Sequence, residues 1–145
     1  MKPYIICDLD GTLCLIEHRL HFIEGKNKHW EAFFEHLDQD ELSAPVDFIL
    51  KKLNEVQIIF VSGRPEEYRQ KTENWLKLKG YTSYKLYMRP TGDYRQDSVV
   101  KKEIYKNTIE SEFGAPLFIL DDRDQVVDMW RSLGLTCFQV RKGDY

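Results

Sequence analysis

The sequence predicts an α/β protein of Rossmann-like architecture, with a parallel sheet of about five strands, helices on both faces and a small helical cap inserted after the first strand. Two patterns carry this prediction. Short apolar runs alternate with longer segments in which apolar residues recur at helical spacing. This alternation is repeated about four times, which is typical of parallel sheets covered by helices. Such sheets bind ligands at the carboxyl ends of their strands, where polar clusters occur in this chain.

Five apolar runs are expected to form the strands. They are residues 4–9, 56–61, 85–88, 117–120 and 136–140. The first and fourth runs end in acidic pairs, and the S-G-R-P segment 62–65 is expected to break the second.

Helices are expected between these runs. The spacing from Trp30 to Leu37, and a similar stripe from Val46 to Leu53, predict amphipathic helices whose apolar faces pack in the core. The expected helix boundaries are Pro45 and Pro65 at first positions, Asp97 as an N-cap, and Gly80 and Gly134 at the ends.

A chain of 145 residues is long enough for one domain with its own core. We therefore expect residues 1–145 to form a single domain. The segment after the first strand is too long for a turn and is partly helical, so residues 15–44 are expected to form the small cap over the site.

Composition narrows the class of protein. The chain has 42% hydrophobic residues and a formal charge of −3, which argues against a surface that coats nucleic acid broadly. Its apolar runs are too short to span a membrane or to form a signal peptide. Three scattered cysteines favour reduced thiols, so we expect a cytoplasmic protein that does not bind membranes.

The first polar cluster is the D-L-D-G-T motif at residues 8–12. Asp8 and Asp10 are two residues apart, so an extended strand would direct both to one side. Their repulsion would be relieved by a divalent cation such as Mg²⁺, which prefers oxygen ligands. Gly11 allows backbone amides to approach a phosphate, and Thr12 adds a hydroxyl. The alternative is a simple D-G turn with solvated acids.

Three further clusters follow later elements. Ser62, Gly63 and Arg64 come after the second predicted strand and can hold phosphoryl oxygens, and Lys101 lies within a predicted helix. Asp121 and Asp122 close the fourth apolar strand, where adjacent acids need solvent or a cation. The serine and lysine signals are weak alone, whereas the adjacent acids are more unusual. Taken together, acids end the first and fourth strands, a hydroxyl ends the second, and a lysine precedes the fourth.

The ordered motifs D-L-D-G-T-L, S-G-R, a helical lysine and strand-D-D resemble those of the haloacid dehalogenase superfamily of phosphotransferases. The C-terminal stretches R-P-T-G-D-Y-R-Q-D-S-V-V-K-K-E-I-Y, F-I-L-D-D-R-D-Q-V-V-D-M-W-R-S-L-G and F-Q-V-R-K-G-D-Y are similar to the 3′-phosphatase domain of bacteriophage polynucleotide kinase–phosphatase. This resemblance is close over residues 86–145 and poor over residues 17–53. No G-x-x-x-x-G-K-[ST] kinase motif occurs, so a stand-alone phosphatase is expected.

The resemblance implies a role for each matching residue. Asp8 would be the nucleophile that forms an aspartyl-phosphate, and Asp10 the general acid and base. Mg²⁺ would be held by Asp8, the Asp10 carbonyl, and Asp121 or Asp122 or both. Ser62 and Lys101 would fix the phosphate. The residues expected to contact substrate are Gly11, Thr12, Arg19, Gly63, Arg64, Arg89, Asp97 and Arg123, with Asp97 orienting Lys101 or capping its helix.

Several aromatic residues could stack on a terminal base: Phe22, Trp30, Phe33 and Tyr94. For Trp30 and Phe33, core packing is the favoured interpretation.

The leading functional hypothesis is a Mg²⁺-dependent phosphatase that removes 3′-phosphates from DNA or RNA ends. A nucleotidase or small-molecule phosphatase keeps the same chemistry, and a non-catalytic binding module is the third alternative. A phosphomutase is disfavoured because the cap is small. A separate kinase or ligase partner is suggested by analogy alone.

Overall fold

A computed structural model describes residues 2–145 of the chain. At its centre is a five-stranded sheet in the order β5-β4-β1-β6-β7, and all neighbouring strands are parallel. The strands are β1 (Tyr4–Cys7), β4 (Gln57–Pro65), β5 (Lys85–Arg89), β6 (Ile119–Asp121) and β7 (Cys137–Gln139). The predicted fold class is confirmed.

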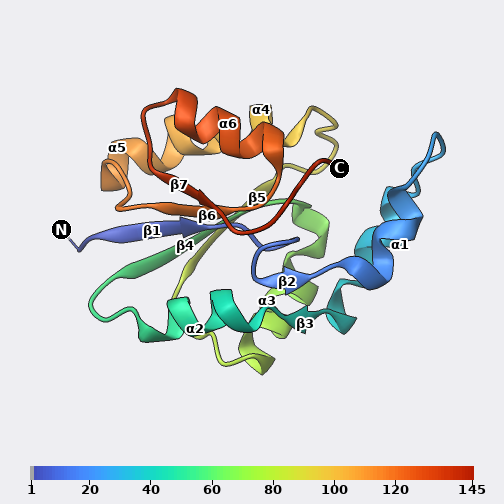
Figure 1. The fold of residues 1–145 in the computed structure, drawn as a ribbon, viewed down its shortest axis with the longest axis horizontal. Coiled ribbons are helices and arrows are strands. Elements are labelled where there is room, and N and C mark those ends of the chain that lie inside the picture. Colours follow the sequence, from blue (N-terminus) through green and yellow to red (C-terminus); the bar gives the residue numbers. More distant parts are fainter. Residues whose placement is uncertain (1) are drawn as a thin grey trace.

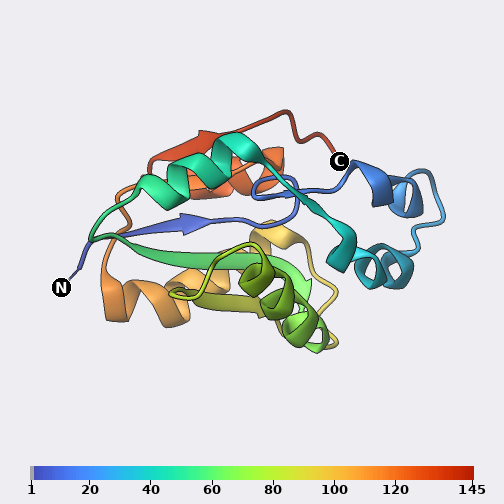
Figure 2. The same cartoon turned by 90° about the horizontal axis from the view of Figure 1, so that it is seen from below.

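Helices cover both faces of the sheet (Figures 1 and 2). One layer consists of α2 (Ala44–Lys52) and α3 (Arg69–Leu78); the other consists of α4 (Asp97–Ile104), a π-helical turn (Tyr105–Ile109), α5 (Glu110–Phe113) and α6 (Asp124–Ser132). Strand β1 alternates between the two cores. Ile5 and Cys7 pack with α2 and α3, whereas Tyr4 and Ile6 pack with the other layer. A strand that is buried on both faces explains the continuous apolar run in the sequence.

A helical insertion follows the first strand, as predicted. It contains β2 (Cys14–Leu15), a 3₁₀ helix (Glu17–Ile23), α1 (Trp30–Glu35), a second 3₁₀ helix (Leu37–Gln39) and β3 (Glu41–Leu42). Strands β2 and β3 pair antiparallel and join the two ends of the insertion at its base. In Figure 1, α1 lies beyond the carboxyl end of β1. The insertion therefore lies at the carboxyl ends of the strands, where parallel sheets bind ligands.

The second predicted strand does not end where the sequence suggested. Strand β4 continues through the S-G-R-P segment to Pro65, and its pairing with β5 shifts in register between Ser62 and Pro65. A bulge of this kind accommodates Gly63 and a proline that donates no ladder hydrogen bond. A short 3₁₀ turn (Glu66–Tyr68) follows, so α3 begins at Arg69 and not at Pro65.

Other boundaries agree with the sequence. Pro45 lies at the start of α2, and Gly80 and Gly134 follow α3 and α6 with φ of 92° and 78°, which favours glycine. The cysteines Cys7, Cys14 and Cys137 are free and buried. Within residues 2–145, the helices are too short or too polar to cross a membrane.

Candidate active site

Three acids meet at the carboxyl ends of two adjacent central strands. Asp8 follows β1 directly, and Asp121 ends the neighbouring strand β6, with Asp122 next to it. Each of these three side chains is buried, and carboxylate oxygens of the three lie within 4.8 Å of one another. We call Asp8, Asp121 and Asp122 the acid cluster.

One lysine and three neutral side-chain donors contact the acid cluster, the third being Tyr145, which is described below. Lys101 Nζ, from α4, lies 2.8 Å from Asp8 Oδ1 and 3.1 Å from Asp121 Oδ2. Thr12 Oγ1 lies 3.3 Å from Asp8 Oδ2 and from Asp122 Oδ1. The indole of Trp130 donates to Asp121 Oδ2 at 3.2 Å, so a core side chain of α6 also orients the cluster. The structure thus brings together five residues that the sequence patterns had marked separately: Asp8, Thr12, Lys101, Asp121 and Asp122.

The charge of the acid cluster is not balanced. Burial, followed by the proximity of Asp121, raises the pKa of Asp8 and raises that of Asp122 to about 6. Burial alone would lower the pKa of Lys101, but Asp121 and Asp8 outweigh it and raise that pKa. Three carboxylates thus share a single ammonium group. A set of oxygen ligands with excess negative charge has the donor chemistry that fits a hard divalent cation.

Gly11 allows Asp122 to approach the turn after β1. Its φ is 84°, and a Cβ atom at this position would overlap with the Asp122 carboxyl group. Both the backbone conformation and the space therefore require glycine here.

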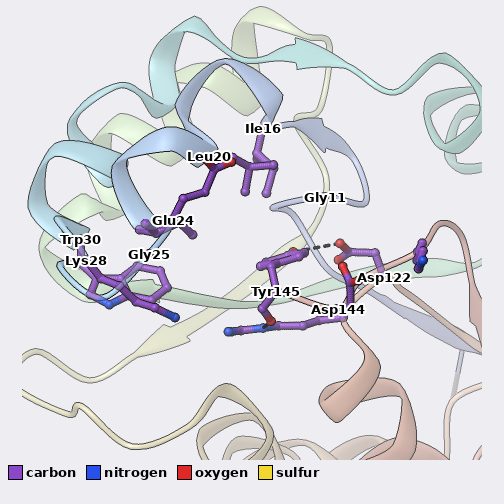
Figure 3. A pocket seen from close by; sticks show the side chains of 13 residues that line it. Gly11, Ile16, Leu20, Glu24, Gly25, Lys28, Trp30, Asp122, Asp144 and Tyr145 are labelled. Carbon is purple, nitrogen blue, oxygen red and sulfur yellow. Dashed lines mark hydrogen bonds between the residues drawn. The ribbon is translucent and has the colours of Figure 1, made fainter.

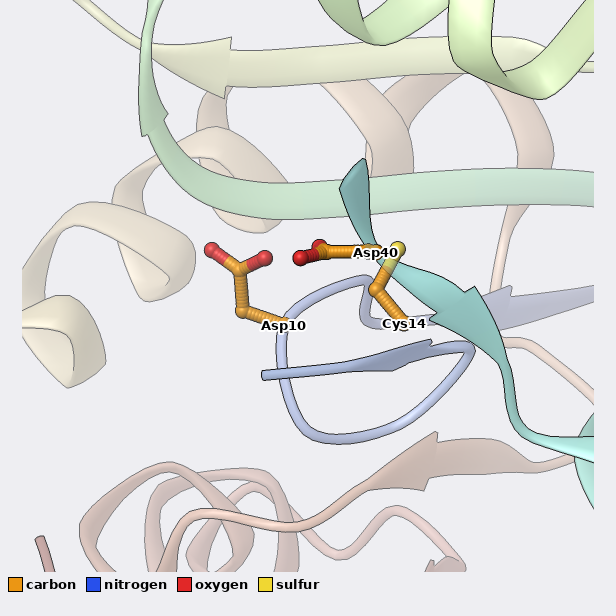
Figure 4. Close-up of side chains that lie close together, drawn as sticks. All are labelled: Asp10, Cys14 and Asp40. Atoms are coloured by element: carbon orange, nitrogen blue, oxygen red, sulfur yellow. The ribbon is translucent and has the colours of Figure 1, made fainter. Parts of the chain in front are cut away.

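A second group of buried charges lies beside the acid cluster. Arg19 Nη2 and Arg64 Nη2 each lie 2.6 Å from Asp10 Oδ1, and Arg19 makes two hydrogen bonds to Asp40, at 2.8 and 2.6 Å. Both arginine side chains are fully buried. In Figure 4 the carboxylates of Asp10 and Asp40 point toward each other. We call Asp10, Asp40, Arg19 and Arg64 the arginine cluster.

The arginine cluster is electrically balanced. Burial alone would raise the pKa of Asp10, but Arg19 and Arg64 outweigh it and hold that pKa well below its ordinary value. Cys14 lies close to Asp10 and Asp40, and burial raises the pKa of its thiol. Two acids compensated by two arginines leave no excess negative charge, so this group does not fit a metal site.

Asp8 and Asp10 do not act as one pair of carboxylates, contrary to the strand-based expectation. Strand β1 ends at Cys7, and the chain then turns at Asp10 and Gly11. Asp8 consequently faces Lys101, while Asp10 faces the two arginines. The D-G turn that the sequence posed as an alternative is present, but its two acids are ion-paired and not freely solvated.

Asp97 links the remaining predicted residues. It forms no N-cap hydrogen bond at the start of α4; instead its carboxylate pairs with Arg89 and, at 2.8 Å, with Arg123. A Cβ atom on Gly63 would overlap with this carboxylate, and Arg89 Nε donates to the Gly63 carbonyl at 2.8 Å. The expected capping role of Asp97 is therefore wrong, since Gln96 is the N-cap of α4 and the Asp97 carboxylate pairs with the two arginines.

Ser62 lies on β4 beside the end of β1. It is 1% exposed, and its Oγ accepts a hydrogen bond from the Arg64 backbone at 3.1 Å. This bond holds the Ser62 hydroxyl at the β4 bulge. Strand β4 pairs with β1, which Asp8 follows.

Three residues near the site gave no decisive signal in the sequence. Asp40 lies in the segment of poor resemblance, yet it is 2% exposed and binds both arginines. Tyr145 Oη donates to Asp122 Oδ2 at 2.8 Å and approaches the Asp10 carbonyl at 3.3 Å. Trp30 was expected in the core but is 38% exposed, whereas Phe33 is buried as expected. Of the other aromatic candidates, Phe22 is partly buried and Tyr94 is 95% exposed.

A parallel α/β sheet with this acid cluster at its carboxyl ends defines a phosphatase domain of the haloacid dehalogenase type. Residues 2–145 match the family model described as "Polynucleotide kinase PNKP phosphatase domain", and the chain belongs to this family.

Two kinds of relatives support this assignment. The chain is 34% identical over 141 residues to a putative bifunctional polynucleotide kinase/RNA ligase of Autographa californica nuclear polyhedrosis virus, covering 94% of this chain. Two solved structures of a Pnkp1/Rnl/Hen1 complex, one described as an RNA repair complex, contain chains 41% and 42% identical, with TM-scores of 0.83 and 0.85 and 99% of this chain covered. The chain spans 19% of the viral protein and 44% and 48% of those two chains.

Proposed function

We propose that this protein removes 3′-phosphates from polynucleotide ends, with RNA as the favoured strand, through an aspartyl-phosphate on Asp8. The observation that carries the proposal is the acid cluster with its single lysine at the carboxyl end of β1. The family supports phosphatase chemistry, and the RNA repair relatives support the polynucleotide substrate.

In the first chemical step, Asp8 Oδ would attack phosphorus and form a phosphorus–oxygen bond. The bond from phosphorus to the sugar oxygen breaks, and Asp10 gives that oxygen its proton. In the second step, Asp10 takes a proton from water while the water oxygen attacks phosphorus. The bond to Asp8 breaks, and inorganic phosphate leaves.

The arginine cluster bears on the role of Asp10. At rest the two arginines keep this carboxyl ionised, which suits its action as a base in the second step. An approaching phosphate dianion would raise the pKa of Asp10 by charge repulsion. Substrate would therefore load Asp10 with the proton that the first step needs.

Mg²⁺ would be held by Asp8, the Asp10 carbonyl and one or both of Asp121 and Asp122, where it would neutralise charge on the phosphoryl oxygens. Lys101 already contacts Asp8 and would hold a phosphoryl oxygen. Ser62, Thr12 and the amides beside Gly11 and Gly63 would supply neutral hydrogen bonds.

The remaining assignments are part of the same proposal. Residues 1–145 act as one phosphatase domain, with residues 15–44 as its cap. The free thiols suit the reducing cytoplasm. Because the relatives are named for kinase and ligase activities, a kinase or a ligase is the partner we propose.

The test is phosphate release, with Mg²⁺, from a short RNA carrying a 3′-phosphate beside the same RNA carrying a 5′-phosphate. Matching DNA strands and nucleoside 3′-monophosphates complete the set. Asp8→Asn controls for contaminating activity, and Asp128→Asn, on the exposed face of α6, is the matched control substitution. Preference for the 3′ end that is lost in Asp8→Asn supports the proposal. Good activity on free nucleotides with negligible release from either strand would contradict it.

A further inference from the structure

A pocket of about 450 Å³ opens beside the acid cluster, and its size is typical of small-ligand sites. It lies between the insertion and the C-terminal residues, and it shares Gly11 and Asp122 with the active site. Figure 3 shows Trp30 and Lys28 on one side of the pocket and Tyr145 with Asp122 on the other. A group bound in this pocket would therefore be adjacent to a phosphate at Asp8.

Part of the pocket wall is apolar and aromatic. Ile16, Leu20 and Ile23, which line it from the insertion, form an aliphatic wall. Trp30 begins α1 and packs on the buried ring of Phe33 edge-on, while part of its own ring stays exposed. A large aromatic side chain left open beside a reaction centre offers a surface on which a flat ring can stack.

Tyr145 is held in place at the inner end of the pocket. Its hydroxyl bonds Asp122 and the Asp10 carbonyl, and the Arg123 guanidinium lies 5.0 Å from the centre of its ring. Arg123 Nε also donates to the Tyr145 carbonyl at 2.9 Å. The Arg123 contacts do not involve the proposed Mg²⁺ ligands, and they keep a second aromatic ring at the boundary between the pocket and the acid cluster.

The charges that line the pocket favour a neutral occupant. Besides Asp122, which belongs to the acid cluster, the lining holds Lys28, Arg123 and Lys142 together with Glu24 and Asp144. Acids interspersed with bases do not form a strong anion site for a second phosphate. They do offer donors and acceptors for the polar edges of a base and a sugar.

We propose that this pocket binds the nucleobase of the terminal nucleotide whose phosphate is removed, with Trp30 and Tyr145 as the stacking surfaces. This inference rests on the proposed 3′-phosphatase function and adds to it a determinant of substrate choice. The base comes either from a strand end or from a free nucleotide, and both present the same ring and sugar to the pocket.

The experiment compares a 3′-phosphorylated RNA with the same strand whose terminal nucleotide is abasic. For the wild-type protein, kcat/KM should be about tenfold higher with the base present, the size of one base–aromatic stack. Trp30→Leu keeps an apolar side chain against Phe33 but removes one of the two stacking rings, so this ratio should fall several-fold. Tyr94→Leu removes an aromatic ring that is 95% exposed and outside the pocket, and it should keep the tenfold ratio.

A binding measurement tests whether the pocket holds the terminal base independently of catalysis. The probe is 2-aminopurine as the terminal base of a 3′-phosphorylated strand, added with Mg²⁺ to Asp8→Asn protein. Stacking should quench its fluorescence, and adding Trp30→Leu should clearly reduce the quenching. A parallel titration with a 2-aminopurine nucleoside 3′-monophosphate shows whether the bound base comes from a strand end or a free nucleotide. Weaker binding of the nucleotide than of the strand identifies a strand end, and equal binding identifies a free nucleotide.

Two results would contradict base binding in the pocket while leaving the proposed 3′-phosphatase function intact. One is an equal wild-type kcat/KM on base-bearing and abasic ends, and the other is an unchanged tenfold ratio in Trp30→Leu. If wild-type protein released phosphate from neither substrate, the proposed function would fail. The fluorescence result would then decide alone, with quenching that depends on Trp30 supporting the pocket and no quenching overturning it.

Discussion

Two groups of buried acids flank the end of β1, and they differ in how their charge is compensated. In the acid cluster, Asp8, Asp121 and Asp122 share Lys101. In the arginine cluster, each of two acids contacts both arginines. Unbalanced buried charge is maintained at a cost to stability and is typical of sites that bind or react, whereas balanced charge fixes structure.

The position of the arginine cluster shows what it fixes. Arg19 and Asp40 lie at the two ends of the helical part of the insertion, while Arg64 lies on the central sheet. Their contacts hold the insertion against the sheet and orient Asp10 away from the acid cluster.

The largest expected effect comes from removing one charge of the acid cluster. Asp8→Asn should lower kcat on a 3′-phosphorylated strand by roughly 10³-fold or more, since it deletes the proposed nucleophile. The same change should leave the free energy of unfolding in EDTA unchanged or raised, because it relieves repulsion among buried carboxylates. Urea titration beside the kinetic assay checks both effects, and a clear loss of stability would contradict the contrast between the clusters.

The equivalent change in the arginine cluster should act on stability. Asp40→Asn leaves Arg19 and Arg64 with a single carboxylate, and removing one partner of a buried ion pair costs about 3–5 kcal/mol. Urea unfolding of this variant is compared with that of Asp38→Asn, whose side chain is 52% exposed two residues away. Equal stability of the two variants would show that the arginine cluster is not structural.

Comparing alanine substitutions at two glycines separates the cost of backbone strain from the cost of steric overlap with a neighbouring side chain. Gly11→Ala and Gly134→Ala both place a Cβ at positive φ, which costs about 1–2 kcal/mol. In Gly11→Ala alone the new atom would overlap with Asp122, while nothing lies within 4 Å at Gly134. Gly11→Ala should therefore be the less stable variant, and its phosphatase activity should fall by roughly 10²-fold, the cost of a small misplacement near reacting atoms. Similar activity in both variants would contradict this assignment.

The last expected effect is stabilisation by metal. Mg²⁺ at a hundred times its Kd should add about 2.7 kcal/mol to the free energy of unfolding. Asp122→Asn should reduce this gain, whereas Asp40→Asn should retain it, with NaCl of matched ionic strength as the control. Thermal unfolding monitors each protein, and an equal Mg²⁺ response in both variants would place the cation elsewhere.

The sequence was informative where local pattern decides structure. Alternating apolar runs and helical stripes predicted the parallel sheet, and motifs at strand ends predicted the residues that meet around Asp8. Those motifs succeed because parallel strands align their carboxyl ends whatever loops join them.

The sequence was less informative where tertiary contacts decide. Asp40 pairs with arginines from two distant segments, which no local pattern reveals. Trp30 fits a helical stripe, yet it begins α1 at the rim of a pocket. Asp97 is a residue type typical of an N-cap, but Gln96 holds that position of α4, and Arg89 and Arg123 bind the Asp97 carboxylate.

The most direct test of Asp8 as the nucleophile is to trap its phosphorylated form. Protein is mixed with Mg²⁺ and a 3′-phosphorylated strand, quenched in acid within one turnover and treated with borohydride, which reduces an aspartyl-phosphate to homoserine. Peptide mass spectrometry should then find homoserine at position 8, and not in reactions that contain EDTA. Full release of phosphate in that turnover with position 8 unmodified, or with the modification at Asp10 or Asp121, would contradict the account.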